Sequence, residues 1–423
     1  MAGTSTCSVA DIEHQCYAIL VATRGQIVDT MRWEMDDGPA ARAGRGPSTP
    51  CGVGPFRAGN GRESSVTDAK GRELPIYQAA GPGGRRFPLL KAMLTTACER
   101  DCLYCAFRAG RNFRRATFKP EEMAHAFADL HHRGLVQGLF LSTGILAGGA
   151  NTQNKLLDAA EILRLKLGFR GYLHLKIMPG AERGQVERAM RLASRVSINL
   201  EAPTPERLAR LAPHKDFSAE LWAPLRWMEA IRRSDPDRSR WASSATQFVV
   251  GGAGESDLEL LTTTTHLYHQ AGLTRAFFSA FEPLRDTPLE NLPAESPRRE
   301  HRLYQASYLI RDYGFDLEEL PFEPDGRLPL DRDPKLAYAE IRLAHAPVEI
   351  NRAAPDELRR VPGIGPRGAE KIVAARRVRR LRDVQQLGAL GIPFGRAAPY
   401  VLMDGRRPPY QLPLLASVPN VEQ

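Results

Sequence analysis

Three cysteines stand close together in a chain that contains few of them. Cys98, Cys102 and Cys105 follow a C-x3-C-x2-C spacing, and all 423 residues include only six cysteines. Thiolates this near one another on a tight loop can converge on one soft metal centre. A [4Fe–4S] cluster usually takes four thiolates, one for each iron. Three cysteines therefore predict a cluster with one iron left open for a further ligand.

Two simpler interpretations of the cysteines stay open at this point. Structural zinc needs four ligands, and the fourth would be Cys51 or His125, neither at the spacing of a zinc motif. The three cysteines could also be unrelated buried residues, which their clustering within eight positions makes the weaker choice. We expect the cluster.

Six short apolar runs rich in β-forming residues alternate with amphipathic, helix-like stretches. The runs are 89–97, 138–144, 172–180, 195–203, 245–252 and 275–283. This alternation predicts parallel β-α units, and six units give a partial (β/α)6 barrel in an α/β fold. Chemistry in such folds lies at the carboxyl ends of the strands. The cysteines directly follow the first run, so the predicted cluster lies at that end.

The cysteine spacing, with the aromatic Tyr104 directly before the third cysteine, resembles the signature of radical S-adenosylmethionine (SAM) enzymes. The resemblance implies that each cysteine binds one iron and that the amino and carboxylate groups of SAM chelate the fourth. One electron from the reduced cluster would cleave the sulfonium C–S bond to methionine and a 5′-deoxyadenosyl radical, which abstracts hydrogen from a substrate. An electron donor such as ferredoxin or flavodoxin is implied as a partner. The sequence identifies no catalytic side chain.

The same resemblance places the SAM pocket at the strand ends, beside Tyr104. Ser142 and Gly144 lie where many such enzymes carry a Gly-Gly-Glu segment that binds the methionine amino group. This chain has Ser-Thr-Gly there, so Ser142 or backbone carbonyls would replace the glutamate. Lys176 ends the third run and is expected to pair with the methionine carboxylate.

Three further residues complete the expected pocket. Asn199 and Glu201 end the fourth run, where related enzymes often contact the ribose. Gly252 ends the fifth run, where a residue without a side chain lets the backbone approach the adenosine.

Residues 347–400 form a basic segment that differs in charge from the rest of the chain. It has eleven basic and five acidic residues, which accounts for +6 of the net charge of +9. A helix is predicted to begin near Pro355, a good first-turn residue, and a second to run from about Arg367. The Gly-Ile-Gly turn between them can aim backbone N–H groups at a phosphate oxygen, because such groups are unpaired at a helix start.

This segment resembles the helix-hairpin-helix motif of DNA repair and DNA uptake proteins, which implies contact with the DNA backbone without base reading. Ile364 would fill the hairpin core. A small helical hairpin that only packs on the barrel is the alternative. The DNA-binding candidates are Gly363, Ile364, Gly365, Arg367 and Lys371.

The two motifs together resemble a family of radical SAM proteins linked with DNA modification or repair. We therefore predict a radical SAM enzyme that acts on DNA. One alternative is a radical SAM enzyme acting on RNA or protein. Another is a non-enzymatic DNA-binding protein with a structural metal site.

Composition and patterning suggest several modules. The hydrophobic share is 43% and the charged share 25%, as in globular proteins. No apolar run approaches the ~18 residues that span a bilayer, and no secretory signal is visible, so we expect a cytoplasmic protein without a membrane partner. The expected parts are an irregular extension (1–85), the partial barrel (86–290), a helical connector (291–346), the all-α helix-hairpin-helix domain (347–400) and a tail (401–423).

Overall fold

The computed structural model describes residues 76–80 and 86–410. Most of the predicted extension, with Cys7, Cys16 and Cys51, lies outside the described residues, as does the chain after residue 410. The described chain divides into two compact units. The first contains the residues up to Glu255 and His266–Pro297, and the second contains Ser256–Thr265 and the residues from Arg298 onward.

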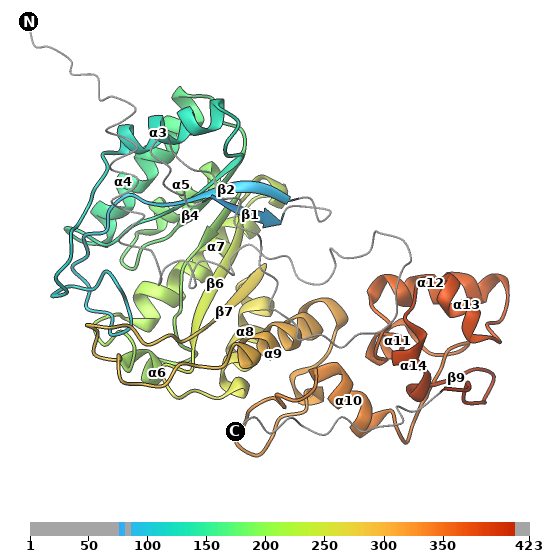
Figure 1. Cartoon of the computed structure of the whole chain (residues 1–423). Helices are drawn as coiled ribbons and strands as arrows, with labels where there is room; N and C mark the ends of the chain where they lie inside the picture. The colour runs from blue at the N-terminus through green and yellow to red at the C-terminus, as the bar shows by residue number, and fades with distance from the viewer. Residues whose placement is uncertain (1–75, 81–85, 411–423) are drawn as a thin grey trace, which may run out of the picture. The chain divides into compact units, whose positions relative to one another are not determined.

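The first unit is built on a seven-stranded sheet whose spatial order equals its chain order, β1 to β7 (Figure 1). Strands β2 to β7 all run parallel to one another. They are Arg86–Met93, Gly138–Ser142, Tyr172–Lys176, Arg195–Ser197, Ser243–Val250 and Arg275–Ala280. Each coincides with one of the six apolar runs. The prediction of a partial α/β barrel is therefore confirmed.

Strand β1, Ile76–Ala80, was not expected. It pairs antiparallel with β2, with Ile76 opposite Leu90 and Ala80 opposite Arg86. Its neighbours in the sequence are rich in glycine and proline, a composition that indicates irregular chain and hides a five-residue strand. The sheet thus gains an antiparallel edge strand next to the strand that leads into the cysteines.

Helices cross between successive strands of this sheet. They are α3 (Pro120–His132), α4 (Gly149–Glu161), α5 (Arg183–Leu192), α6 (Pro205–Ala209), α7 (Ala223–Ser234) and α8 (Asp257–Gln270). Helix α6 shows why such helices begin where they do: Thr204 accepts a hydrogen bond from the Arg207 amide, and Pro205 takes the first position, where no N–H is needed. The crossovers bring the carboxyl ends of β2 to β7 to one edge.

The second unit is mainly helical. Its helices are α9 (Pro297–Tyr308), α10 (Pro334–Arg342), α11 (Pro355–Arg360), α12 (Pro366–Val378), α13 (Val384–Ala389) and α14 (Phe394–Ala397), and a π-helical turn, η6 (Leu309–Tyr313), extends α9. Strands β8 (Val348–Glu349) and β9 (Val401–Leu402) pair in parallel. One hydrophobic core holds residues from α10 through β9, among them Ala339, Ile364 and Ile372. Helix α10, expected in a separate connector, therefore shares the core of the hairpin region.

Within the described part of the chain, no helix is long and apolar enough to cross a membrane.

Candidate functional site

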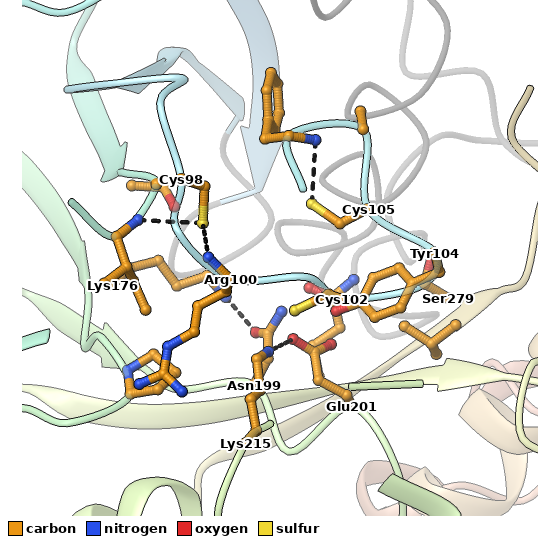
Figure 2. A pocket seen from close by; sticks show the side chains of 18 of the residues that line it. Cys98, Arg100, Cys102, Tyr104, Cys105, Lys176, Asn199, Glu201, Lys215 and Ser279 are labelled. Atoms are coloured by element: carbon orange, nitrogen blue, oxygen red, sulfur yellow. Dashed lines mark hydrogen bonds and ion pairs between the residues drawn. The ribbon is translucent and has the colours of Figure 1, made fainter. Parts of the chain in front are cut away.

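The three cysteines border one cavity of about 230 Å³. Figure 2 shows their sulfur atoms around the same space at the end of the sheet. The Cys98 sulfur accepts hydrogen bonds from the amides of Arg100 and Ile145, both at 3.4 Å, and the Cys105 sulfur accepts one from Phe107, also at 3.4 Å. Amide donors of this kind stabilise a sulfur that carries negative charge.

The guanidinium group of Arg115 binds several backbone carbonyls of the cysteine loop. Arg115 donates to the carbonyls of Thr96 and Phe107, both at 2.7 Å, and to those of Arg108 and Arg111 at 2.8 and 3.1 Å. Its planar group also lies 3.8 Å from the ring centre of Phe113. Arg115 thus stabilises the conformation of the cysteine loop.

Replacing Arg115 with methionine removes all of these bonds and leaves several carbonyls without a donor. Hydrogen bonds to a charged group contribute roughly 1.5–3 kcal/mol each in favourable cases, so we expect a loss of about 3 kcal/mol in the free energy of unfolding. Urea denaturation of the metal-free protein measures it. Arg114→Met, at the exposed neighbouring position, is the matched control and should stay within about 0.5 kcal/mol of wild type. Equal free energies of unfolding for the two variants would show that Arg115 does not stabilise the loop.

Gly144, predicted to bind SAM, also allows two loops to touch. Its amide donates to the Thr95 carbonyl at 2.7 Å, and an added Cβ would lie 2.2 Å from the carbonyl oxygen of Ala97. Only glycine fits at that distance. The contact fixes the start of the cysteine loop against the end of β3, where Ser142 lines the cavity.

Two predicted strand-end residues meet each other across β4 and β5. The Lys176 ammonium group donates to the side-chain oxygen of Asn199, and both residues line the cavity. Gly252 is the exception among the predicted pocket residues. It does not line the cavity, and a Cβ there would come within 2.9 Å of Leu211 and 3.0 Å of Phe281, so it serves close packing.

Glu201 occupies an unusual backbone position beside the cysteines. Its φ of 65° lies in the left-handed region, which is uncommon for a residue other than glycine and is often found at functional sites. Its amide and carbonyl pair with Gln247 and Val249 of β6, at 3.0 and 2.8 Å. This pairing holds the carboxylate at the cavity after β5 has ended.

Lys215 is the main site residue that the sequence interpretation missed. Its ammonium group donates to Glu201 Oε1 at 3.0 Å, and 9% of its side chain is exposed. It comes from the loop after α6, and no motif marks it. Further lining residues that were not predicted are Arg100, Thr143, Gln247, Ser279 and Glu282.

The donor set fits an iron–sulfur cluster and a bound cofactor. Burial raises the pKa of the Cys102 thiol, and it raises the pKa of Cys105 to about 12, so iron must displace protons from both. Burial and the negative charge of Glu201 also raise the pKa of Tyr104 well above its usual value. Glu201 Oε2 is buried without a hydrogen-bond partner. A hydroxyl group of a bound molecule would satisfy it.

The zinc alternative finds little support in the geometry. His125 is exposed on α3 and does not line the cavity, and Cys51 lies outside the described residues.

The C-terminal hairpin forms as the sequence predicts. Helices α11 and α12 flank the turn, Ile364 is buried, and Gly363 has a φ of 84°, which favours glycine. Gly365 instead has a φ of −93° and caps α12. The amide of Ala369 pairs with the Gly365 carbonyl, while the first-turn amides before it have no partner within the helix.

Two lysines donate hydrogen bonds to backbone carbonyls in and next to the hairpin. Lys335 of α10 donates to the Ile364 carbonyl at 2.6 Å, and burial lowers its pKa to about 7. Lys371, predicted to bind DNA, donates to the Leu390 carbonyl at 2.9 Å. That carbonyl belongs to a second turn between α13 and α14, in which Gly391 has a φ of 78°. Arg367 is exposed at the start of α12.

Comparison with protein families identifies both modules. A model of the radical SAM superfamily matches residues 93–265, and a model of the helix-hairpin-helix motif matches residues 344–390. Residues 93–265 are thus similar to the radical SAM superfamily, whose enzymes use a [4Fe–4S] cluster and SAM, and residues 344–390 are similar to the helix-hairpin-helix motif. A comparison with curated protein sequences gives no match.

Similar solved structures include several radical SAM enzymes. Methylornithine synthase (PylB) is 15% identical, with a TM-score of 0.43 and coverage of 54% of this chain and 64% of its own. The hydrogenase maturase HydG from Carboxydothermus hydrogenoformans is 16% identical, with a TM-score of 0.41 and coverage of 53% and 51%. A methyltransferase from Sphaerobacter thermophilus is 13% identical, with a TM-score of 0.41 and coverage of 58% and 73%. The chain thus spans about half to two thirds of the first two relatives, and none of the three identifies its substrate.

Proposed function

We propose that this enzyme binds DNA through its helix-hairpin-helix motif and performs radical chemistry on a nucleotide, in DNA modification or repair. The observation that carries the proposal is the presence on one chain of a cavity bordered by three cysteines and a hairpin with unpaired first-turn amides. The basic balance of residues 347–400 supports a polyanionic partner.

At the cavity, we infer that Cys98, Cys102 and Cys105 ligate the cluster. Bound together, the cluster and SAM supply reductive cleavage to methionine and a 5′-deoxyadenosyl radical. The chain's own groups position the cofactor. The buried, unpartnered oxygen of Glu201 would accept a hydrogen bond from a cofactor hydroxyl, and the end of β3 at Ser142 would face its methionine part.

In the second unit, the turn before α12 would hold a phosphate group of the DNA backbone. The first-turn amides and the N-terminal end of a 13-residue helix favour an anion. Arg367 adds an exposed guanidinium group in the same turn. Such contacts give affinity without sequence preference.

Isotope transfer tests the proposal directly. The reconstituted, reduced full chain is incubated under anaerobic conditions with SAM and duplex DNA deuterated in its deoxyribose and bases. We expect 5′-deoxyadenosine to form faster with DNA and to gain deuterium, because the radical takes a hydrogen atom from its substrate. Damaged and undamaged duplexes are compared, and altered nucleotides are mapped.

Transfer RNA and a basic protein serve as competing substrates in the same assay. If either stimulates 5′-deoxyadenosine formation as well as every DNA substrate, and deuterium from DNA is not transferred, the DNA assignment is wrong. The radical SAM chemistry itself would then stand, with another substrate.

A further inference from the structure

Lys215 is a buried cation at the wall of the cluster cavity. It lies on the loop between α6 and the π-helical turn η4 (Phe217–Trp222) and lines the same cavity as Cys102 and Cys105. In Figure 2 it extends from below toward Glu201, which stands beside Cys102. Burying an ammonium group costs free energy unless the charge is paired. We therefore asked what the charge of Lys215 does at this cavity, beyond packing.

The loop that carries Lys215 is attached to the cysteine loop at two points just before the lysine. The Leu103 amide donates to the Leu211 carbonyl at 2.7 Å, and Arg100 Nη1 donates to the His214 carbonyl at 2.7 Å. Because these bonds join the two loops, the backbone that carries Lys215 is held against the cysteine loop.

The positive charge of Lys215 interacts with the cysteines as well as with Glu201. Burial by itself would lower the pKa of Lys215, but the negative charge of Cys102, followed by that of Glu201, raises it above its ordinary value. Lys215 and Cys102 line the same cavity, so the ammonium group lies at the wall of the space that the cluster would fill.

We propose that Lys215 is a positioning residue that makes the cluster easier to reduce by holding a positive charge beside the Cys102 ligand. Reduction adds one electron, supplied by an external one-electron donor, to a centre already bound by three thiolates. A nearby cation stabilises the added negative charge, and its effect is larger in a buried site than in water. This inference goes beyond the DNA function, because it concerns the cluster alone.

The reduction potential of the cluster is the decisive measurement. The reconstituted full chain is titrated with soluble redox mediators and followed by electron paramagnetic resonance, without SAM or nucleic acid. In Lys215→Met we expect the ratio of reduced to oxidised cluster at a fixed potential to fall about tenfold, which is about 59 mV for a one-electron couple. Lys215→Arg keeps the charge and should restore most of the ratio. Lys155→Met, at an exposed position on α4, should match wild type.

A double variant separates charge from structural damage. Lys215→Met alone leaves Glu201 buried without its cation, whereas Lys215→Met with Glu201→Gln leaves neither charge. We expect the double variant to bind iron normally and still to be harder to reduce. A potential equal to wild type in the double variant overturns the proposal, as does loss of the cluster from both variants, which would make Lys215 a structural residue. Since no nucleic acid is present, neither result bears on the DNA assignment.

Discussion

Cys102→Ala is expected to abolish reductive cleavage of SAM and to leave DNA affinity within about twofold of wild type. Cys102 is the buried one of the three cysteines on the loop, with 8% of the residue exposed, and it lines the cavity together with Lys215. Without it, a second iron of the cluster has no protein ligand. Iron and sulfide analysis after anaerobic reconstitution should show far fewer than about four of each per chain, and 5′-deoxyadenosine should fall to background.

Cys51→Ala is the matched control for this result. It removes a thiol that the zinc alternative would recruit as a fourth ligand, and we expect normal iron content and normal cleavage. In both variants, DNA affinity measured by fluorescence anisotropy tests whether the helix-hairpin-helix region is intact. SAM cleavage that persists in Cys102→Ala would show that the cysteines were assigned wrongly. Stoichiometric zinc without sulfide in the wild-type protein would do the same.

Gly363→Val is expected to reduce DNA affinity at least tenfold while SAM cleavage without DNA stays normal. A β-branched residue resists a φ of 84°, and strain of this kind costs about 1–3 kcal/mol. An added Cβ would also lie 3.1 Å from the Pro393 carbonyl oxygen and 3.2 Å from its ring. The turn must therefore shift, and the first-turn amides of α12 lose their alignment. Anisotropy titrations with duplex DNA at two salt concentrations measure the loss.

Gly388→Val is the matched glycine control, because nothing lies within 4 Å of a Cβ at that position of α13. It should bind DNA nearly as wild type does. Arg367→Gln gives a finer readout without strain. Removal of one phosphate contact should weaken binding to all sequences alike and reduce the slope of log affinity against log salt by about 0.9. Normal, salt-sensitive binding by Gly363→Val would place the DNA site elsewhere.

The sequence could predict the barrel strands and both motifs because each depends on neighbours in the chain. Alternating apolar runs locate β2 to β7, and the P-G-I-G turn with its flanking helices locates the hairpin. Strand β1 was missed because its five residues stand among glycines and prolines. Only the structure shows that the two hairpin glycines differ: Gly363 has a positive φ, whereas Gly365 has an ordinary φ.

The rest of the candidate site depends on contacts between distant segments. Lys215 reaches Glu201 across fourteen positions, and Arg100 reaches His214 across 114. Arg115 looks like one of several basic residues in a loop, yet its four carbonyl partners are set only when the loop has folded. No local pattern distinguishes it from Arg114. Spacing could therefore identify the cysteines, and only the fold could identify what holds them.

The close approach at Gly144 limits how this enzyme can change over time. Even a methyl group there would collide with the oxygen of Ala97, so the smallest replacement pushes the first sulfur away from its companions. Changes toward new substrates would therefore fall at other residues that line the cavity, such as Ser279 on β7 and Glu282 just after that strand. A library aimed at altered selectivity should randomise those two positions and leave the glycine untouched.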